Sequence, residues 1–392
     1  MEKNESFSEI GSALVLSRKC KYYSFLYQII KMLLQNLLLP LIYRCCCLKS
    51  PKIDPDLVIL ADAHHAALPP SMLQMKRTME ANGFKTEEYT RDYARLPLAE
   101  LLRTLIHFMN RYSKAHYVFL CDNFLPVASC TKRPETIVVQ LWHGGGALKK
   151  FGYDTEDDIP SWYLGNVFKN YDLVTVSSER CVKPFASAMR LNERQVRPLG
   201  ISRTDVYFQP GYAQTCREKL YRRFPELMGK KLLLWAPTFR ENQRNSTVPG
   251  CHEMERLESM LGLSWRVIKK LHPHIDPGED EISRLFSAEE LLPVIDYLVT
   301  DYSSIVFDYL LFERPFAFFV PDLEEYTAKR GLYMSLDEFP GEKAKTAEEL
   351  YAAVMASWDH EKKEQLRSCR KKFMEACDGQ ASRRILEEIG LL

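Results

Sequence analysis

The chain has 392 residues, of which 46% are hydrophobic, so it is long enough for two domains that each bury a core. The formal net charge is +1, with 53 Lys and Arg against 52 Asp and Glu, which gives no global basic field for nucleic-acid binding. The 11 cysteines include no CxxC pair, which argues against a disulfide framework or a zinc site and indicates reduced thiols in a cytosolic compartment.

Residues 1–52 form a basic segment with an amphipathic centre. From Arg18 to Lys52 there are seven basic residues and no acidic one. Between Tyr22 and Leu39, polar residues recur at helical spacing and leave a wide apolar face, and Pro40 is expected to end or kink this helix. The longest uncharged run is 12 residues, well below the roughly 20 of a spanning helix, so we predict a helix lying on an anionic membrane surface.

Two other interpretations apply to this segment. The helix could instead pack on its own domain or on a partner subunit. The run Cys45–Cys47 is in addition a candidate for palmitoylation, with weak support.

Strands alternate with helices over residues 53–211, which indicates a first Rossmann-like domain. Buried strands are expected at Leu57–Leu60, Tyr117–Cys121, Thr136–Leu141 and Leu173–Ser177. The first strand runs into His64 and His65. These two histidines either face a ligand across a cleft or are solvated loop residues.

A glycine-rich loop, Gly144–Gly146, follows the strand that ends at Leu141. Its glycines let the backbone approach a ligand closely. His143 stands between the strand end and this loop, where a neutral imidazole is suited to take a hydroxyl proton near neutral pH. Lys149 and Lys150 follow and can meet phosphate charge. The alternative for His143 is a simple turn residue.

The turn Val196–Asp205 closes the first domain. Arg203 in this turn can bridge to a phosphate across the cleft or pair with Asp205 as a loop staple. The polar stretch Tyr212–Leu227 is expected to join the two domains.

The second domain, residues 212–392, repeats the strand–turn–helix plan. The strand Lys231–Trp235 is followed by Thr238 and Arg240, a hydroxyl and a guanidinium that suit a phosphate or merely cap a helix. The strand Trp265–Leu271 delivers Lys270. His272 comes next, and because it precedes a proline its backbone is held extended.

The stretch Val294–Asp322 is expected to form a strand, a polar turn, a helix and a second strand. Small polar side chains there meet a helix N-terminus at the carboxyl end of a parallel strand, a place that suits a diphosphate. The alternative is that Thr300 and Asp301 only cap the helix and that Ser303 and Ser304 are solvated. The predicted substrate contacts are Thr300, Asp301, Ser303, Ser304 and Asp308.

Five segments occur together in a familiar order: QLWHGGGALKKFG, RPLGISRTD, LLLWAPTFR, KKLHP and VIDYLVTDYSSIVFDYLLFERPFAFFVPDLEEY. Over roughly Leu57–Leu391 the chain resembles the CDP-glycerol glycerophosphotransferase family of teichoic acid synthesis. The resemblance implies a GT-B architecture, in which two Rossmann-like domains face a central cleft, and a place at the cytoplasmic face of the cell membrane. The loop after His143 is one residue longer than in polymerase members, and the histidine-containing loop Asp62–Pro70 is a second departure.

The resemblance also implies roles for individual residues. His143 and His272 would be catalytic, and the donor diphosphate would lie on Thr300, Ser303 and Ser304. Arg240 and Asp301 would stand close by. The other predicted substrate contacts are Lys149, Lys150, Arg203, Thr238 and Lys270.

These observations predict a transferase that moves glycerol phosphate from CDP-glycerol to a hydroxyl of a lipid-linked polyprenyl-diphosphate acceptor and releases CMP. His143 would be the general base. Neither a metal nor a cofactor is predicted, and a homo-oligomer is left open. The alternatives are a CDP-ribitol donor, a sugar-nucleotide glycosyltransferase of the same architecture, and an inactive membrane-bound binding module.

Overall fold

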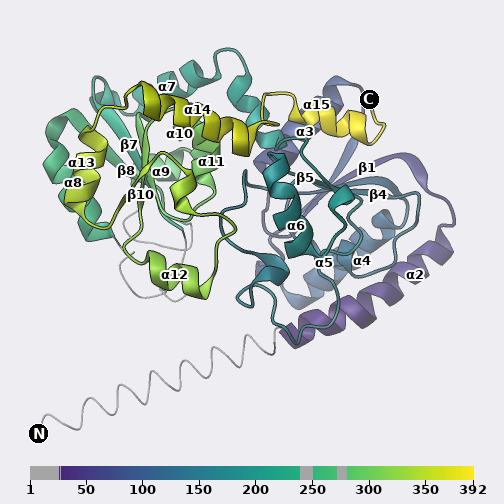
Figure 1. The fold of residues 1–392 in the computed structure, drawn as a ribbon. Coiled ribbons are helices and arrows are strands. Elements are labelled where there is room, and N and C mark those ends of the chain that lie inside the picture. The colour runs from purple at the N-terminus through teal and green to yellow at the C-terminus, as the bar shows by residue number, and fades with distance from the viewer. Residues whose placement is uncertain (1–25, 27, 239–249, 272–279) are drawn as a thin grey trace, which may run out of the picture.

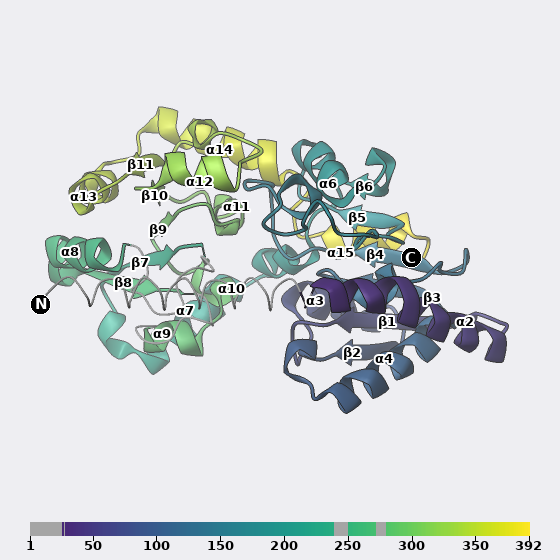
Figure 2. The ribbon, with the colours of Figure 1, turned by 90° about the horizontal axis from the view of Figure 1, so that it is seen from below.

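The computed structural model describes residues 26, 28–238, 250–271 and 280–392. It contains two sheets, one in each half of the molecule (Figures 1 and 2). Neighbouring strands pair in parallel throughout the described part of both sheets. The predicted α/β class with two parallel sheets is confirmed.

The first sheet has the strand order β2-β1-β3-β4-β5-β6. Its strands and main helices are β1 (Asp54–Asp62), α3 (Pro70–Ala81), β2 (Thr86–Thr90), α4 (Leu98–Tyr112), β3 (Ala115–Leu120), α5 (Leu125–Ala128), β4 (Ile137–Gln140), β5 (Leu173–Thr175), α6 (Val182–Met189) and β6 (Val196–Arg197). In β1, Val58 and Leu60 pack towards α3, whereas Leu57 and Ile59 pack towards α4. Burial on both faces explains why the stretch 57–61 of this strand is continuously apolar.

The second sheet has the order β11-β10-β9-β7-β8. Its elements are α7 (Tyr212–Arg223), β7 (Lys231–Ala236), α8 (Cys251–Leu261), β8 (Trp265–Lys269), α9 (Glu281–Leu285), α10 (Ala288–Leu291), β9 (Tyr297–Thr300), α11 (Ile305–Leu310), β10 (Phe316–Phe319), α12 (Leu323–Lys329), β11 (Glu342–Ala344), α13 (Ala347–Met355) and α14 (His360–Met374). In β7, Leu233 faces α8 and α13, while Leu232 and Leu234 face α11 and α14.

The C-terminal helix α15 (Ala381–Glu388) returns to the first domain. Ile385 and Leu386 are fully buried in the cluster that also contains residues of α3 and β1 (Figure 1). Asp205 caps the helix, because its carboxylate accepts hydrogen bonds from the backbone N–H groups of Ala381, at 3.0 Å, and Ser382, at 2.8 Å. The predicted division into 53–211 and 212–392 takes no account of this returning helix. In the structure, Asp205 pairs with the start of α15 and not with Arg203.

The N-terminal helix continues past Pro40 to Lys49, so the prediction that it ends there is wrong, and the alternative of a kink stays a prediction. It includes the π-helical turn Leu34–Leu38, labelled η1, and α2 (Leu39–Lys49). Leu39 N–H donates to the carbonyl of Leu34, five residues back. The proline ring lacks an N–H and would clash with the carbonyl four residues before it, so a wider turn at this point lets the helix continue.

One face of this helix packs on the first domain. Leu39 and Tyr43 are buried in its core. The Gln35 amide donates to the carbonyl of Asn166 at 2.8 Å and accepts from the Tyr163 hydroxyl at 2.6 Å. The alternative interpretation, packing on its own domain, therefore applies to this face.

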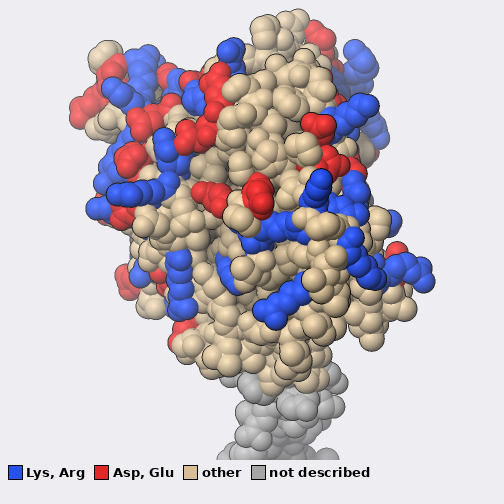
Figure 3. All heavy atoms as spheres, turned by 90° about the vertical axis from the view of Figure 1, so that its right-hand side faces the viewer, with Lys and Arg blue, Asp and Glu red and all other residues tan. Residues whose placement is uncertain are grey.

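The opposite face of the helix is exposed and apolar; we call it the outer apolar face. Its members are Leu26, Ile30, Leu33, Leu37, Leu38, Leu41 and Leu48. Among the described residues, Gln28–Lys49 is the one helix that by length and composition could cross a membrane, contrary to the estimate from its uncharged run. Figure 3 views the side of the molecule along which α2 runs, and its lower part is largely uncharged with scattered Lys and Arg.

Candidate active site

His143 lies just beyond the end of β4, in a loop whose backbone is fixed from several sides. The preceding residue, Trp142, has a φ of +57°, a conformation that is uncommon for a bulky side chain. Its N–H donates to the Gln140 side chain at 3.0 Å, and its carbonyl accepts from the Ser71 hydroxyl at 3.0 Å. The indole stacks on the His143 ring with centroids 4.5 Å apart. Backbone strain held by such contacts is typical of functional sites.

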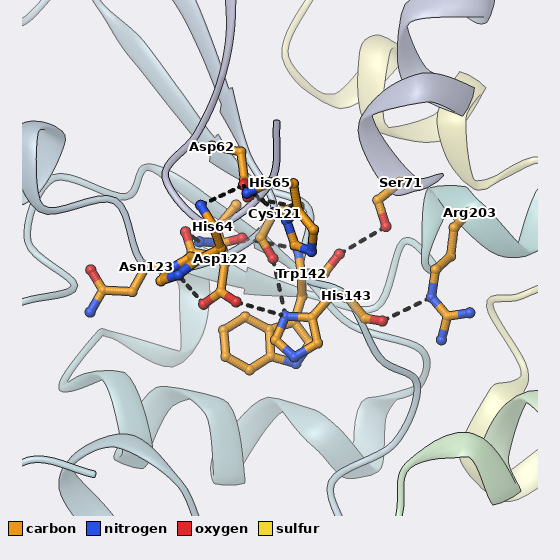
Figure 4. Close-up of polar contacts among 11 residues, drawn as sticks. Asp62, His64, His65, Ser71, Cys121, Asp122, Asn123, Trp142, His143 and Arg203 are labelled. Carbon is orange, nitrogen blue, oxygen red and sulfur yellow. Dashed lines mark hydrogen bonds and ion pairs between the residues drawn. The ribbon is translucent and has the colours of Figure 1, made fainter. Parts of the chain in front are cut away.

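The His143 ring is oriented through Nδ1. This atom lies 3.2 Å from the carbonyl oxygen of Cys121 and 3.6 Å from the carboxylate of Asp122, both at the end of β3 (Figure 4). A carbonyl oxygen only accepts, so this hydrogen bond requires the proton of the neutral ring to sit on Nδ1. The lone pair is then on Nε2, which has no hydrogen-bond partner among the described residues. His143 is thus arranged as a proton acceptor.

The loop with His64 and His65 borders this arrangement. The carboxylate of Asp62 accepts from their backbone N–H groups at 2.8 and 2.7 Å and lies 2.9 Å from Nδ1 of His65. The Cys121 thiol points to the same carboxylate at 3.5 Å. Figure 4 shows the loop next to Cys121, whose carbonyl contacts His143. The two histidines are neighbours of the candidate site, and a role for them stays a prediction.

The glycine loop contacts the start of α11 in the second domain. An ideal Cβ on Gly144 would stand 3.0 Å from the Ser304 hydroxyl oxygen, and one on Gly146 would stand 2.3 Å from the Phe307 ring. Gly146 has a φ of +63°, and its N–H donates to the Ser177 hydroxyl at 2.8 Å. Glycine is therefore required here for close approach as well as for backbone conformation.

A cavity of about 320 Å³ lies at this contact between the two domains. His143, Lys149 and Ser304, three of the predicted site residues, line it together. Its walls also include Asp122 and Lys31, which were not predicted as site residues. The structure thus brings a proton acceptor, a cation and a hydroxyl into one space.

The two lysines after the glycine loop sit where the domains meet. Burial lowers the pKa of Lys149, and the negative charge of Asp301 opposes that effect. Lys149 forms an isolated antiparallel bridge with Leu332, and the N–H of Lys150 donates to the carbonyl of Gly331 at 3.0 Å. Arg330 donates to the carbonyl of Lys150 at 2.9 Å. Their backbones therefore hold the interface, while the Lys149 side chain faces the cavity.

Several predicted contacts around β9 and α11 have partners inside the protein. The Thr300 hydroxyl is buried and donates to the carbonyl of Ala236 at 2.7 Å. The carboxylate of Asp301 accepts from both the N–H and the hydroxyl of Thr238, each at 2.7 Å. Ser303 accepts a long 3.4 Å hydrogen bond from Ile305 N–H. Of this group, Ser304 lines the cavity.

Arg203 and Asp308 form a buried ion pair across the domain interface. Their side chains are 8% and 3% exposed, and the guanidinium also donates to the carbonyl of His143 at 2.8 Å. Burial raises the pKa of Asp308, against the opposing charge of Arg203. A substrate contact by either residue would require this pair to open. The predicted alternative for Arg203, pairing with Asp205, is not what the structure shows.

Three further predictions concern the second domain. The Lys270 ammonium donates to the carbonyls of Ser283 and Phe286, the latter at 3.1 Å, so it holds the segment around α9. His272 and Arg240 lie outside the described residues. Their predicted roles stay predictions.

Sequence reasoning missed Asp122 and Lys31 as cavity residues. Asp122 directly follows a predicted strand, so the rule that sites lie at the carboxyl ends of parallel strands could have found it. Lys31 carries no comparable signal. It was one polar position among several on an amphipathic helix.

Comparison with known proteins agrees with this geometry. The family model for CDP-glycerol:poly(glycerophosphate) glycerophosphotransferase matches residues 82–391. The chain belongs to this family. The predicted family and the predicted class of enzyme, a transferase of teichoic acid synthesis, are thereby confirmed.

Individual relatives include primases and polymerases. The chain is 34% identical to the teichoic acid ribitol-phosphate primase of Bacillus spizizenii over 290 residues, 69% of this chain and 74% of the primase. It is 29% identical to the teichoic acid glycerol-phosphate primase of Bacillus subtilis, covering 69% of this chain and 73% of the relative. The poly(ribitol-phosphate) polymerase of B. spizizenii is 33% identical, and the match spans 49% of its length.

Solved structures share the fold at lower identity. The wall teichoic acid polymerase TagF superposes with a TM-score of 0.73 at 19% identity, over 94% of this chain and 97% of that chain. A putative UDP-N-acetylglucosamine 2-epimerase from Listeria monocytogenes has a TM-score of 0.56 at 11% identity, over 86% of this chain and 96% of that one. These matches support the two-sheet architecture.

Proposed function

We propose that this enzyme transfers glycerol phosphate from CDP-glycerol to a hydroxyl group of a lipid-linked acceptor and releases CMP. The observation that carries the proposal is the open Nε2 of His143 in a cavity shared with Lys149 and Ser304. A hydroxyl acceptor needs a base, and a diphosphate donor needs cations and hydrogen-bond donors. The cavity brings both kinds of group together.

In the proposed reaction, Nε2 of His143 takes the proton of the acceptor hydroxyl. The oxygen then forms a bond to the β-phosphorus of CDP-glycerol, and the bond from that phosphorus to the CMP oxygen breaks. Cys121 and Asp122 keep the ring oriented and stabilise the imidazolium that forms. Phosphoryl transfer of this kind depends mostly on positioning and on charge stabilisation.

The donor diphosphate is proposed to lie against Ser304, at the start of α11, with the Lys149 ammonium beside it. These groups would offset the charge that grows on the diphosphate oxygens. By family resemblance, His272 and Arg240 would complete this set. CDP-ribitol is the second candidate donor, because a ribitol-phosphate primase is among the more similar relatives at 34% identity.

The enzyme is further proposed to act at the cytoplasmic face of the cell membrane. The N-terminal helix is docked on the first domain by one face, so its outer apolar face is left to meet lipid. A helix fixed in this way suits the plane of the membrane surface better than a path through the bilayer. Exposed Arg44 lies beside the apolar face and can contact anionic head groups.

The reaction is tested with purified enzyme, membrane lipids and either CDP-glycerol or CDP-ribitol, by measuring CMP release and product length. His143→Ala should lower turnover on the order of 10²-fold or more, because the proton acceptor is lost. The matched control is His252→Ala, whose 85% exposed side chain lies on α8 and should leave turnover unchanged. Donor binding without CMP release by the wild type would favour the binding-module alternative. Unchanged turnover of His143→Ala would remove it as the base.

The membrane contact is tested by sedimentation with phosphatidylglycerol vesicles. Leu37→Glu combined with Leu41→Glu should weaken vesicle binding by roughly tenfold or more, since two exposed leucines of the outer apolar face no longer enter lipid. Leu263→Glu is the control, because that leucine is 91% exposed in the second domain. Equal loss in both variants would contradict a specific role for the helix.

A further inference from the structure

Lys31 reaches from the N-terminal helix into the cavity that contains His143. Its ammonium lies 5.7 Å from the centroid of the Tyr163 ring. Among the described residues, no carboxylate forms an ion pair with it. An ammonium group in a partly dehydrated site is costly without an anion, and burial accordingly lowers the pKa of Lys31. The position therefore suits an anionic ligand.

The other charges of the cavity do not neutralise Lys31. The two carboxylates that line the cavity have other partners. Asp158 pairs with Arg330 at 2.8 Å, and Asp122 lies 3.6 Å from Nδ1 of His143. Lys149 is the second cavity lysine without an ion-pair partner among the residues described. Among the described residues, neither lysine has a carboxylate within ion-pair distance, although Asp301 and Asp158 act on Lys149 from further away. This arrangement suits two anionic groups, or one extended anion, in the cavity during the reaction.

These two lysines belong to different sides of the cavity. The charge of Asp301, at the end of β9, acts on Lys149, and the Lys149 backbone bridges to Leu332. Lys149 therefore stands towards the second domain and the proposed donor. Lys31 instead stands beside Tyr163 of the first domain, on the helix that carries the outer apolar face. Lys31 therefore lies at the side of the cavity that is nearest to the proposed membrane contact.

The N-terminal helix has one face towards the cavity and the opposite face towards the proposed lipid. Lys31, Gln35 and Leu39 are four residues apart and share the face towards the domain. Ile30 and Leu37 lie on the outer apolar face of the same helix. A lipid-linked acceptor whose tail enters the membrane beside this helix would carry its phosphate close to Lys31. A membrane-anchored phosphate is thus the ligand that fits both faces at once.

We infer that Lys31 binds the phosphate of the membrane-anchored acceptor and so holds the acceptor hydroxyl near His143. This inference rests on the proposed function and adds a substrate-binding residue to it. Lys31 lies outside residues 82–391, the part of the chain that matches the family model. The assignment therefore concerns this chain and does not follow from family membership.

The test compares the wild type with Lys31→Gln, Lys31→Arg and Lys49→Gln. Lys49→Gln is the matched control, because it removes the same charge from an exposed position on the same helix. The acceptor probe is a farnesyl-diphosphate-linked glycerol phosphate, and the donor is the CDP-polyol that the wild type turns over. Steady-state kinetics gives the KM for each substrate, and calorimetry without donor measures binding of the acceptor probe directly.

Lys31→Gln should raise both the KM and the Kd for the acceptor probe about tenfold or more, because a charge-assisted hydrogen bond is lost. The KM for the CDP-polyol should change less than about twofold by the same reasoning. Lys31→Arg should restore most of the acceptor affinity, and Lys49→Gln should leave both constants unchanged. Binding to phosphatidylglycerol vesicles should be unchanged in Lys31→Gln, because this lysine faces the cavity and not the lipid.

Three results would overturn the inference. These are an unchanged acceptor Kd, an effect confined to the CDP-polyol, or a loss of acceptor affinity matched by Lys49→Gln and by weaker vesicle binding. If Lys31→Gln does not fold, Lys31→Met, which keeps the packing of the stem, replaces it. A wild type that binds the acceptor probe but releases no CMP would refute the proposed function while leaving the inference in place.

Discussion

The two domains contribute to the cavity in different ways. In the first domain, the His143 ring is fixed through Nδ1, and its Nε2 has no partner within the described part of the chain. In the second domain, the hydroxyl of Thr300 and the carboxylate of Asp301 are bonded to the protein itself, and Ser304 is the predicted hydroxyl at the cavity wall. A polar side chain at the end of a parallel strand can thus serve the ligand or the fold. Its hydrogen-bond partners distinguish the two.

The largest expected effect concerns the pair that joins the two sides. Arg203→Ala should lower the free energy of unfolding by about 3–5 kcal/mol, because Asp308 is left as an unpaired buried charge. The bond to the carbonyl of His143 is lost as well. Chemical denaturation followed by circular dichroism measures the change.

The control for this prediction is a second ion pair between the domains. Arg180 contacts Glu338 at 3.0 Å, but its side chain is 54% exposed. Arg180→Ala should therefore change stability by less than about 1 kcal/mol. Similar losses in the two variants would mean that burial does not set the strength of this interface.

A second prediction targets the contact between the glycine loop and α11. In Gly144→Ala, the new Cβ would lie 3.0 Å from the Ser304 hydroxyl oxygen, so the loop or the serine must shift by a few tenths of an ångström. Because catalysis depends on placement, turnover should fall roughly tenfold. CMP release at saturating donor and acceptor measures the effect.

The double variant Gly144→Ala with Ser304→Ala sharpens this test. Removing the hydroxyl makes room for the added methyl group. Part of the lost turnover should therefore return, beyond what the sum of the single effects gives. Strict additivity would show that Gly144→Ala acts through the backbone and not through Ser304.

Some of this arrangement could be predicted from the sequence because it is local. His143 follows an apolar strand and precedes three glycines, and the stretch Val294–Asp322 alternates strand, helix and strand. Such patterns depend on neighbours within a few residues. They placed His143, Lys149 and Ser304 at strand ends that meet in one cavity.

The parts that escaped prediction depend on contacts between distant residues. Arg203 and Asp308 are 105 positions apart, and each resembled a ligand-binding residue until its partner was known. The return of α15 to the first domain rests on the capping of its backbone by Asp205, 176 and 177 positions away. The continuation of the helix beyond Pro40 depends on a π-helical turn that no propensity rule placed there.

The smallest expected effects test the comparison most directly, in a pair of single variants. Thr300→Val keeps the shape of a fully buried side chain but removes its hydrogen bond to Ala236. It should cost about 1 kcal/mol of unfolding free energy and leave the KM for the donor unchanged. Ser304→Ala should do the reverse. Its hydroxyl makes no capping bond to α11, so stability should stay within about 0.5 kcal/mol.

For Ser304→Ala, the KM for the CDP-polyol should rise about fivefold, the value of one hydrogen bond to the ligand. Denaturation and steady-state kinetics on the same two preparations separate the outcomes. The opposite pattern, with Thr300→Val changing the KM and Ser304→Ala changing only stability, would place the donor on β9. The bond from Thr300 to Ala236 would then have to open when substrate binds, because that hydroxyl has one proton and it is already donated.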